Sequence, residues 1–122
     1  MVVENKRKLY DFNYLKEEAI KRIISTFEPE RIFIFGSYAK GTANEDSDLD
    51  ILIEFKEVEH KRKLAIQIRK LFYDFPIAKD ILVISQDEES KYKQKKWSIY
   101  YHALKEGKLV YERESTGMEN MA

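Results

Sequence analysis

The chain has 122 residues and carries 22 Lys and Arg against 22 Asp and Glu, so its formal net charge is zero. This length accommodates one compact domain and is too short for a core plus a separate substrate lobe. The neutral balance argues against a general nucleic-acid coat protein, and the absence of Cys excludes disulfides, thiolate metal sites and a cysteine nucleophile. A 43% hydrophobic fraction argues against disorder, and the apolar runs are far shorter than the roughly 20 residues that span a bilayer. We therefore expect a folded, soluble, cytoplasmic domain that contacts no membrane and does not bind nucleic acid directly.

The first half of the chain alternates between helical and strand patterns. Apolar residues recur at helical spacing after Asn13, which we expect to cap the helix, and the pattern stops at Pro29. Residues 31–35 form a short, β-rich apolar run that ends at Gly36, which is typical of a buried strand. A polar loop follows, and residues 48–55 predict a second strand that begins with acidic residues.

The second half continues this alternation. Residues 58–75 predict a long helix, and residues 80–85 predict a third strand. Residues 86–96 are highly charged and could form a helix or a loop. Residues 98–106 predict a last helix, followed by Gly107 in the left-handed position that commonly ends helices and then by a short strand. Strands alternating with helices around one core predict an α/β (α+β) domain, a small mixed sheet with helices packed on it.

One segment, from Gly36 to Asp50, combines glycines, hydroxyls and acids in a way that indicates chemistry. A phosphate-binding P-loop has the spacing of Gly36 and Gly41 but needs a lysine where Thr42 stands. A calcium loop of the EF-hand type needs a glycine where Ile51 stands. Neither motif is present.

Acidic residues at the starts of two predicted strands offer a metal site instead. Asp48 and Asp50 lie two apart on a strand, so their carboxylates project from one face and can hold divalent cations, for which Mg²⁺ is the best match. Asp80 adds a third carboxylate if its strand lies alongside in register. Upstream, Gly36 and Ser37 begin a short helical turn whose free N–H groups and hydroxyl suit an anionic phosphate.

The residues Gly36-Ser37-Tyr38-Ala39-Lys40-Gly41 and Ser47-Asp48-Leu49-Asp50 resemble the signature of the nucleotidyltransferase superfamily related to DNA polymerase beta. The family pattern is G-S-x-A-R-G and then S-D-x-D followed by hydrophobic residues. The chain departs from it mainly in having Lys40 for the usual Arg, which keeps the charge but loses bidentate phosphate geometry. The resemblance extends from Arg31 to about Tyr111.

This resemblance implies a nucleotidyltransferase fold and the transfer of a nucleoside monophosphate from an NTP, with ATP as the expected donor, to an acceptor hydroxyl. Asp48 and Asp50 would hold two Mg²⁺ ions, and Asp80 would ligate the first ion and help to take the acceptor proton. The residues expected to bind the nucleotide are Gly36, Ser37, Lys40 and Ser47. We expect one minimal catalytic domain over residues 1–112 and a flexible tail over residues 113–122.

The size of the chain also resembles that of minimal nucleotidyltransferases that pair with a helical HEPN protein. Such a pair can act as a toxin and antitoxin, with the transferase adenylylating the toxin. Small-molecule transferases of the superfamily generally carry an added helical lobe, for which this chain has no room. We therefore expect protein adenylylation within a hetero-oligomeric antitoxin pair. The alternatives are transfer to RNA or to a small molecule, and a non-catalytic nucleotide-binding module that neutralises its partner by contact alone.

Several of these residues also have a structural interpretation. Asp80 could be a turn acid, Ser37 could serve only as a helix cap, and Lys40 could be a solvated surface lysine. The lysine run over residues 91–96 is most simply a solvated face, with docking of a partner or nucleic acid as the rarer interpretation. The residues expected to lie in the core or at a partner interface are Trp97, Tyr100, Tyr101 and Tyr111. No chemistry is expected of His60 or His102.

Overall fold

A computed structural model describes residues 10–77 and 79–114 of the chain. These residues form one mixed sheet with the strand order β3-β2-β1-β4. The strands are β1 (Arg31–Phe35), β2 (Leu49–Phe55), β3 (Lys79–Ser85) and β4 (Lys108–Glu112). Strands β2 and β3 pair in parallel, whereas β1 is antiparallel to both β2 and β4. The predicted small mixed sheet is confirmed, and its first three strands begin within one residue of the predicted positions.

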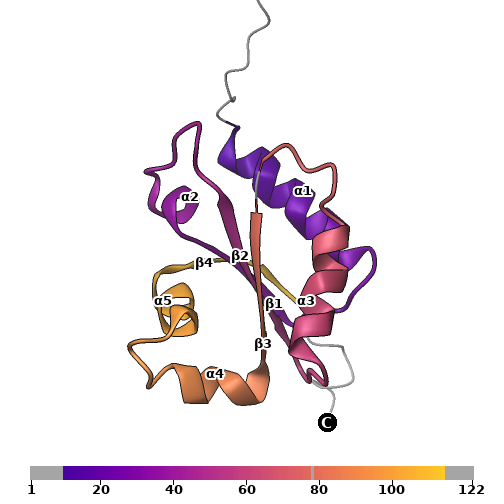
Figure 1. The fold of residues 1–122 in the computed structure, drawn as a ribbon, viewed down its shortest axis with the longest axis vertical. Coiled ribbons are helices and arrows are strands. Elements are labelled where there is room, and N and C mark those ends of the chain that lie inside the picture. Colours follow the sequence, from indigo (N-terminus) through magenta and orange to yellow (C-terminus); the bar gives the residue numbers. More distant parts are fainter. Residues whose placement is uncertain (1–9, 78, 115–122) are drawn as a thin grey trace, which may run out of the picture.

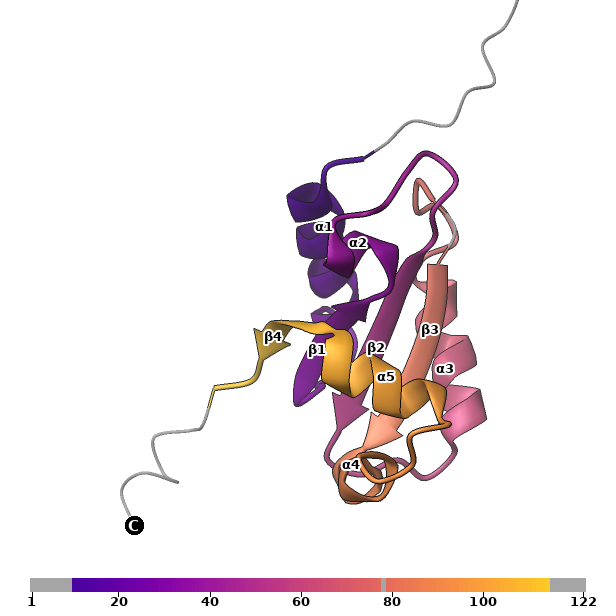
Figure 2. The same ribbon diagram turned by 90° about the vertical axis from the view of Figure 1, so that its left-hand side faces the viewer.

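Helices cover both faces of this sheet. They are α1 (Phe12–Ile24), α2 (Ser37–Lys40), α3 (Lys61–Lys70), α4 (Gln86–Tyr92) and α5 (Ile99–Glu106). Helices α1 and α3 lie on one side and α4 and α5 on the other, while the short helix α2 follows the end of β1 (Figures 1 and 2). None of the described helices is long and apolar enough to cross a membrane.

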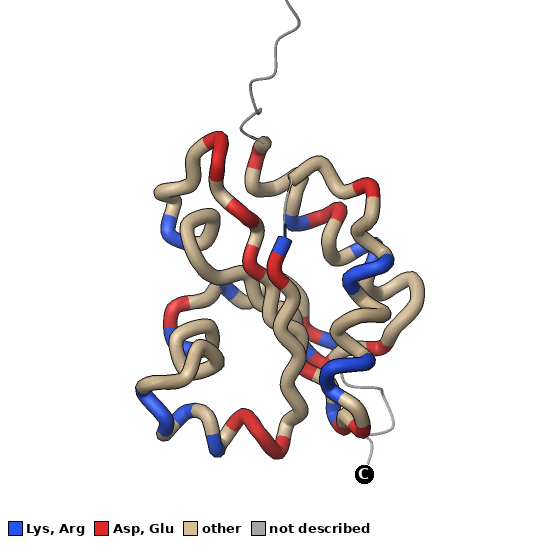
Figure 3. The backbone as a smooth tube through the Cα atoms, viewed as in Figure 1, with Lys and Arg blue, Asp and Glu red and all other residues tan. Residues whose placement is uncertain are grey.

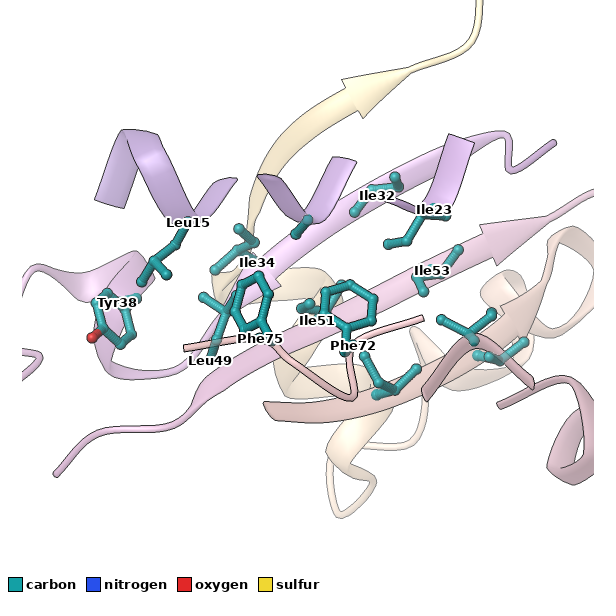
Figure 4. Packing of buried hydrophobic residues seen from close by; sticks show 14 of the residues in the cluster. Leu15, Ile23, Ile32, Ile34, Tyr38, Leu49, Ile51, Ile53, Phe72 and Phe75 are labelled. Atoms are coloured by element: carbon teal, nitrogen blue, oxygen red, sulfur yellow. The ribbon is translucent and has the colours of Figure 1, made fainter. Parts of the chain in front are cut away.

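Alternation along the strands divides the core into two clusters. Ile51 and Ile53 of β2 belong to the larger cluster, together with Leu15 and Ile23 of α1. Figure 4 shows the side chains of this cluster meeting between the sheet and the helices. Leu52 points to the other face and belongs to the smaller cluster, which includes residues of α5. The sheet is therefore buried on both sides.

The structure corrects two predicted helix boundaries. Asp11 caps α1, because its carboxylate accepts a hydrogen bond from the Tyr14 N–H at 3.1 Å, so Asn13 lies within the helix and is not the cap. Helix α3 is shorter than the pattern predicts, since the chain turns after Lys70. Phe72 is nevertheless fully buried, as its position in the apolar pattern predicts, although it lies beyond the end of α3.

The end of α5 is also different from the prediction. Gly107 has a φ of −74°, so it is not the left-handed residue expected there. It is needed for another reason, because a Cβ at this position would lie 2.4 Å from the carbonyl oxygen of Ala103. Ile99, the first residue of α5, is half-exposed. Beyond β4, the N–H of Arg113 still donates to the carbonyl of Glu30, and residues 115–122 of the predicted tail lie outside the described residues.

A buried ion pair ties the sheet to α4. Among the described residues, Glu54 is the one fully buried ionisable side chain, and it accepts hydrogen bonds from Arg31 at 2.7 and 2.9 Å. The guanidinium of Arg31 also pairs with Glu89 of α4. Hydrogen bonding to Glu54 raises the pKa of Arg31 far above its ordinary value. The guanidinium of Arg31 therefore stays charged at every physiological pH.

Candidate active site

The sheet brings acidic residues together at the start of its two parallel strands. In the register of β2 and β3, Asp50 lies opposite Asp80, and Asp48 immediately precedes β2. On the other side, Asp50 lies opposite Phe35, the last residue of β1. Figure 3 shows the acidic start of β2 beside the acidic start of β3. The alignment of strands that the sequence argument required is therefore present.

These carboxylates influence one another electrostatically. Burial raises the pKa of Asp50 to about 6, and the negative charges of Asp80 and Asp48 add to the effect. Asp50 is half-buried, whereas Asp48 and Asp80 are exposed. Asp50 therefore holds a proton at a pH where an ordinary aspartate is ionised, and a bound cation would favour its charged form.

Strand alternation decides which face of the sheet these acids use. Asp50 lies two residues before Leu52, and Asp80 lies two residues before Leu82, so each pair shares a face. Both leucines pack in the cluster that contains Ala103 of α5. The carboxylates consequently open toward the side of α5, away from α1 and α3.

Gly36 makes room for the central acid. Its backbone has a φ of +75° and a ψ of −155°, a conformation that is accessible essentially only to glycine. A Cβ at this position would lie 2.2 Å from Oδ2 of Asp50. Gly36 is expected to let a phosphate approach the backbone, and in the structure it also allows the Asp50 carboxylate to lie against the backbone.

We expect Gly36→Ala to displace the Asp50 carboxylate and to destabilise the protein by about 1–3 kcal/mol through backbone strain. Gly41→Ala is the matched control, because Gly41 also has a positive φ of +76° but a Cβ there would meet nothing within 4 Å. We expect the control to cost about 1 kcal/mol. An NMR titration should show the pKa of Asp50 falling in Gly36→Ala and unchanged in Gly41→Ala. Equal behaviour of the two variants would contradict the steric argument.

The two serines expected at a nucleotide site differ in how their hydroxyl groups are placed. Ser37 is the first residue of α2, and because Gly36 is the N-cap, the interpretation of Ser37 as a helix cap is wrong. The hydroxyl of Ser47 accepts a hydrogen bond from the Asn44 N–H at 2.8 Å and so closes the loop before β2. Ser37 is thus better placed than Ser47 to offer a free hydroxyl.

Lys40 is paired with a residue that the sequence analysis did not identify. Its Nζ lies 3.2 Å from Oε1 of Glu106 at the end of α5, and this pairing lowers the pKa of Glu106. The tertiary fold brings the two helix ends together, so spacing along the chain could not reveal the contact. One signal was available, because an acid at a helix C-terminus opposes the helix dipole and therefore calls for a cationic partner.

The donor set fits a hard divalent cation. Within residues 10–77 and 79–114, no group of three or more His, Cys, Asp or Glu side chains is placed closely enough to hold a metal ion as it stands. Besides burial, the negative charges of Asp80 and Asp48 raise the pKa of Asp50, and carboxylate oxygens are the ligands that Mg²⁺ prefers. The assignment of Asp48, Asp50 and Asp80 as metal ligands stays a prediction.

Comparison with known proteins places this arrangement in context. The profile of a family described as "Nucleotidyltransferase domain" matches residues 16–110. A Methanocaldococcus jannaschii protein named as a protein adenylyltransferase is 31% identical over 102 residues, which cover 79% of this chain and 98% of the relative.

Solved structures show the same fold. A nucleotidyltransferase structure from Sulfolobus solfataricus matches with a TM-score of 0.61 and 24% identity, covering 84% of this chain and 81% of that one. The MNT antitoxin of Shewanella oneidensis, solved in complex with its tri-AMPylated HEPN toxin, matches with a TM-score of 0.52 and 15% identity. That match covers 91% of this chain and 78% of the antitoxin.

Proposed function

Because the chain belongs to the nucleotidyltransferase domain family, we propose that it transfers AMP from ATP to a hydroxyl group of a partner protein. We further propose that this partner is a helical HEPN toxin and that the chain acts as its antitoxin. The register pairing of Asp50 with Asp80 carries the catalytic part of the proposal. Similarity to a relative named as a protein adenylyltransferase over nearly its whole length supports the choice of a protein acceptor.

The positions of the three acids suggest two roles, metal binding and proton transfer. Asp48, Asp50 and Asp80 would hold Mg²⁺, and when bound the two ions would supply positive charge that stabilises the attacking and leaving oxygens. Strand β3 lies at the edge of the sheet and Asp80 is exposed, so an acceptor hydroxyl can reach it. A carboxylate oxygen of Asp80 would take the proton as the acceptor oxygen bonds to the α-phosphorus and pyrophosphate leaves.

The turn between β1 and α2 would hold the rest of the nucleotide. The N–H groups at the start of α2 and the Ser37 hydroxyl would donate hydrogen bonds to the β- and γ-phosphates. Gly36 places this turn against Asp50, so the phosphate contacts and the acids belong to one site. Because the chain supplies no covalent intermediate in this scheme, positioning and electrostatics account for the rate.

Label transfer tests this proposal directly. ATP tagged on its α-phosphate would be incubated with Mg²⁺, the purified chain and lysate of the source cells. We expect a discrete labelled protein band with the wild type and none with an Asp48→Asn, Asp50→Asn variant. Asp46→Asn is the matched control, because Asp46 is an exposed acid of the neighbouring loop and should leave the label unchanged.

The other outcomes each point to a different function. Label in RNA or in a small molecule would retain the enzyme class and contradict the protein acceptor. A band that survives the double substitution would contradict the catalytic role of the two acids. If the double variant neutralises the partner at full strength and no fraction is labelled, the chain acts as a binding module.

A further inference from the structure

The lysines of the chain are unevenly distributed. Residues 91–105 contain five lysines and no Asp or Glu, although the chain as a whole is neutral. These lysines are Lys91, Lys93, Lys95, Lys96 and Lys105. The remainder of the chain is therefore acidic by the same amount, although helix α3 is also basic. On the side of the sheet that carries α4 and α5, the lysines lie at the end of α4, in the turn that follows it and on α5.

Few of these positive charges are neutralised within the protein. In the part of the chain that the structure describes, Lys93 is the one member of this group with an ion pair, 3.9 Å from Glu89. Lys95 lies over the ring of Trp97, and Lys105 lies over the ring of Tyr101. The ammonium groups are thus held near aromatic rings but remain available to an external acid.

Apolar groups lie among these lysines. Lys93, Tyr101, Leu104 and Lys105 line a hollow of about 270 Å³ between α4 and α5. Trp97, in the turn between the two helices, is 79% exposed, which is unusual for the largest apolar side chain. The surface therefore combines an apolar floor with a cationic rim.

This surface and the acid cluster lie on one side of the sheet. The acids open toward α5, and Figures 1 and 2 both show α5 lying between α4 and α2. Ser85, the cap of α4, lies five residues after Asp80 along β3, which is about 17 Å of strand. A ligand beside Lys93 at the end of α4 is therefore distant from the reacting phosphates, but a protein lying along α5 would contact both places.

We propose that Lys93, Lys95, Lys96, Trp97 and Lys105, here called the lysine surface, dock an acidic segment of the acceptor protein that also carries an apolar side chain. The proposal rests on the proposed function, because it names how the acceptor of that reaction is held. Helix α3 is similarly basic, but it covers the opposite face of the sheet from the acids. Both surfaces match an acidic segment in charge, and the face shared with the acids selects the lysine surface.

A protein segment fits this surface better than a nucleic acid does. Single-stranded nucleic acids need aromatic faces on which bases can stack. Here the ammonium of Lys95 lies over the exposed ring of Trp97, and Tyr92 and Tyr100 stack on each other with ring centroids 4.5 Å apart. The hollow accommodates an aliphatic side chain, and acidic neighbours on the same segment would meet the lysines.

Fluorescence anisotropy with a labelled peptide of alternating Glu and Leu tests the docking. We expect the wild type to bind it, with affinity falling as salt rises. Lys93→Glu, Lys105→Glu should bind at least tenfold more weakly. Lys63→Glu, Lys70→Glu on α3 is the matched control, since it changes the same charge at two exposed lysines on the other face and should bind like the wild type.

Three outcomes would overturn the proposal. They are failure of the wild type to bind the peptide, equal loss of binding in both double variants, and preferential binding of a single-stranded RNA of equal charge. In the lysate assay, Lys93→Glu, Lys105→Glu should lose protein label, whereas Lys63→Glu, Lys70→Glu should keep it. If the wild type labels no protein, the proposed function fails and the peptide measurement alone decides the docking.

Discussion

Asp50→Asn is expected to stabilise the metal-free protein and at the same time to abolish AMP transfer. Burial and the neighbouring charges of Asp80 and Asp48 disfavour the charged form of Asp50 and raise its pKa to about 6. At pH 7 the carboxylate is nevertheless mostly charged. An amide removes this unfavourable charge. Allowing for solvent screening of a half-exposed group, we expect a gain of about 1 kcal/mol in the free energy of unfolding. Transfer should fall by roughly 10³-fold or more, because the site loses a ligand charge.

Thermal unfolding with and without Mg²⁺ measures both halves of this prediction. Without Mg²⁺, Asp50→Asn should melt above the wild type. With Mg²⁺, the melting temperature of the wild type should rise because the cation binds the folded state, and that of the variant should rise much less. Asp46→Asn again serves as the control and should follow the wild type. If the variant is less stable than the wild type without Mg²⁺, then the charge of Asp50 does not destabilise the folded state.

The pH dependence of stability gives an independent check on the same group. The folded pKa of Asp50 is about 6 and its ordinary value is 3.8, so between these values the folded state binds more protons than the unfolded state. Its contribution to stability is therefore fully present below pH 4 and is lost as the pH rises through 6. The free energy of unfolding of the wild type, measured relative to Asp50→Asn, should decrease over this interval. A flat difference would contradict the raised pKa.

Much of this site could be predicted because its parts are local in sequence. Asp48 and Asp50 flank Leu49, the first residue of β2, so the period-two alternation expected of a strand places them on one face. Asp80 needed one further assumption, the parallel register of β3, and the apolar run after it is the kind of strand that lies in a sheet buried on both sides. A strand pattern and its acidic first residues were enough to place three side chains.

The contacts that tune the site could not be predicted, because each depends on distant backbone. The approach of Asp50 to Gly36 follows from the antiparallel pairing of β1 with β2, and the pairing of Lys40 with Glu106 follows from the path of α5. The conformation of Gly107 is a similar case. A glycine after a helix commonly signals a left-handed cap, but here close packing on Ala103 requires it. Glycine is required at this position by the lack of space for a Cβ and not by a positive φ.

Removal of Arg31 is expected to destabilise the protein more than any change at the candidate site. Glu54 is fully buried in β2 and receives two hydrogen bonds from Arg31, so Arg31→Met would leave a buried carboxylate without a counter-charge. Loss of one partner of a buried ion pair typically costs about 3–5 kcal/mol. Methionine keeps the apolar character of the arginine stem, so the loss reports on the guanidinium, which pairs with Glu54 and also lies over the ring of Phe33.

A double-mutant cycle separates the cost of leaving Glu54 buried without a counter-charge from the net contribution of the ion pair to the free energy of unfolding. Arg31→Met, Glu54→Leu should recover most of the stability lost in Arg31→Met, because the replacement pair buries no charge. Glu89→Gln is the control for the outer contact of Arg31 and should cost less than about 1 kcal/mol, since Arg31 keeps Glu54. Urea unfolding of the wild type, the single variants Arg31→Met and Glu54→Leu, the double variant and the Glu89→Gln control measures these differences as shifts in the midpoint at constant slope. If Arg31→Met costs no more than Glu89→Gln, then water reaches Glu54 and the bridge does not tie β1, β2 and α4 into one unit.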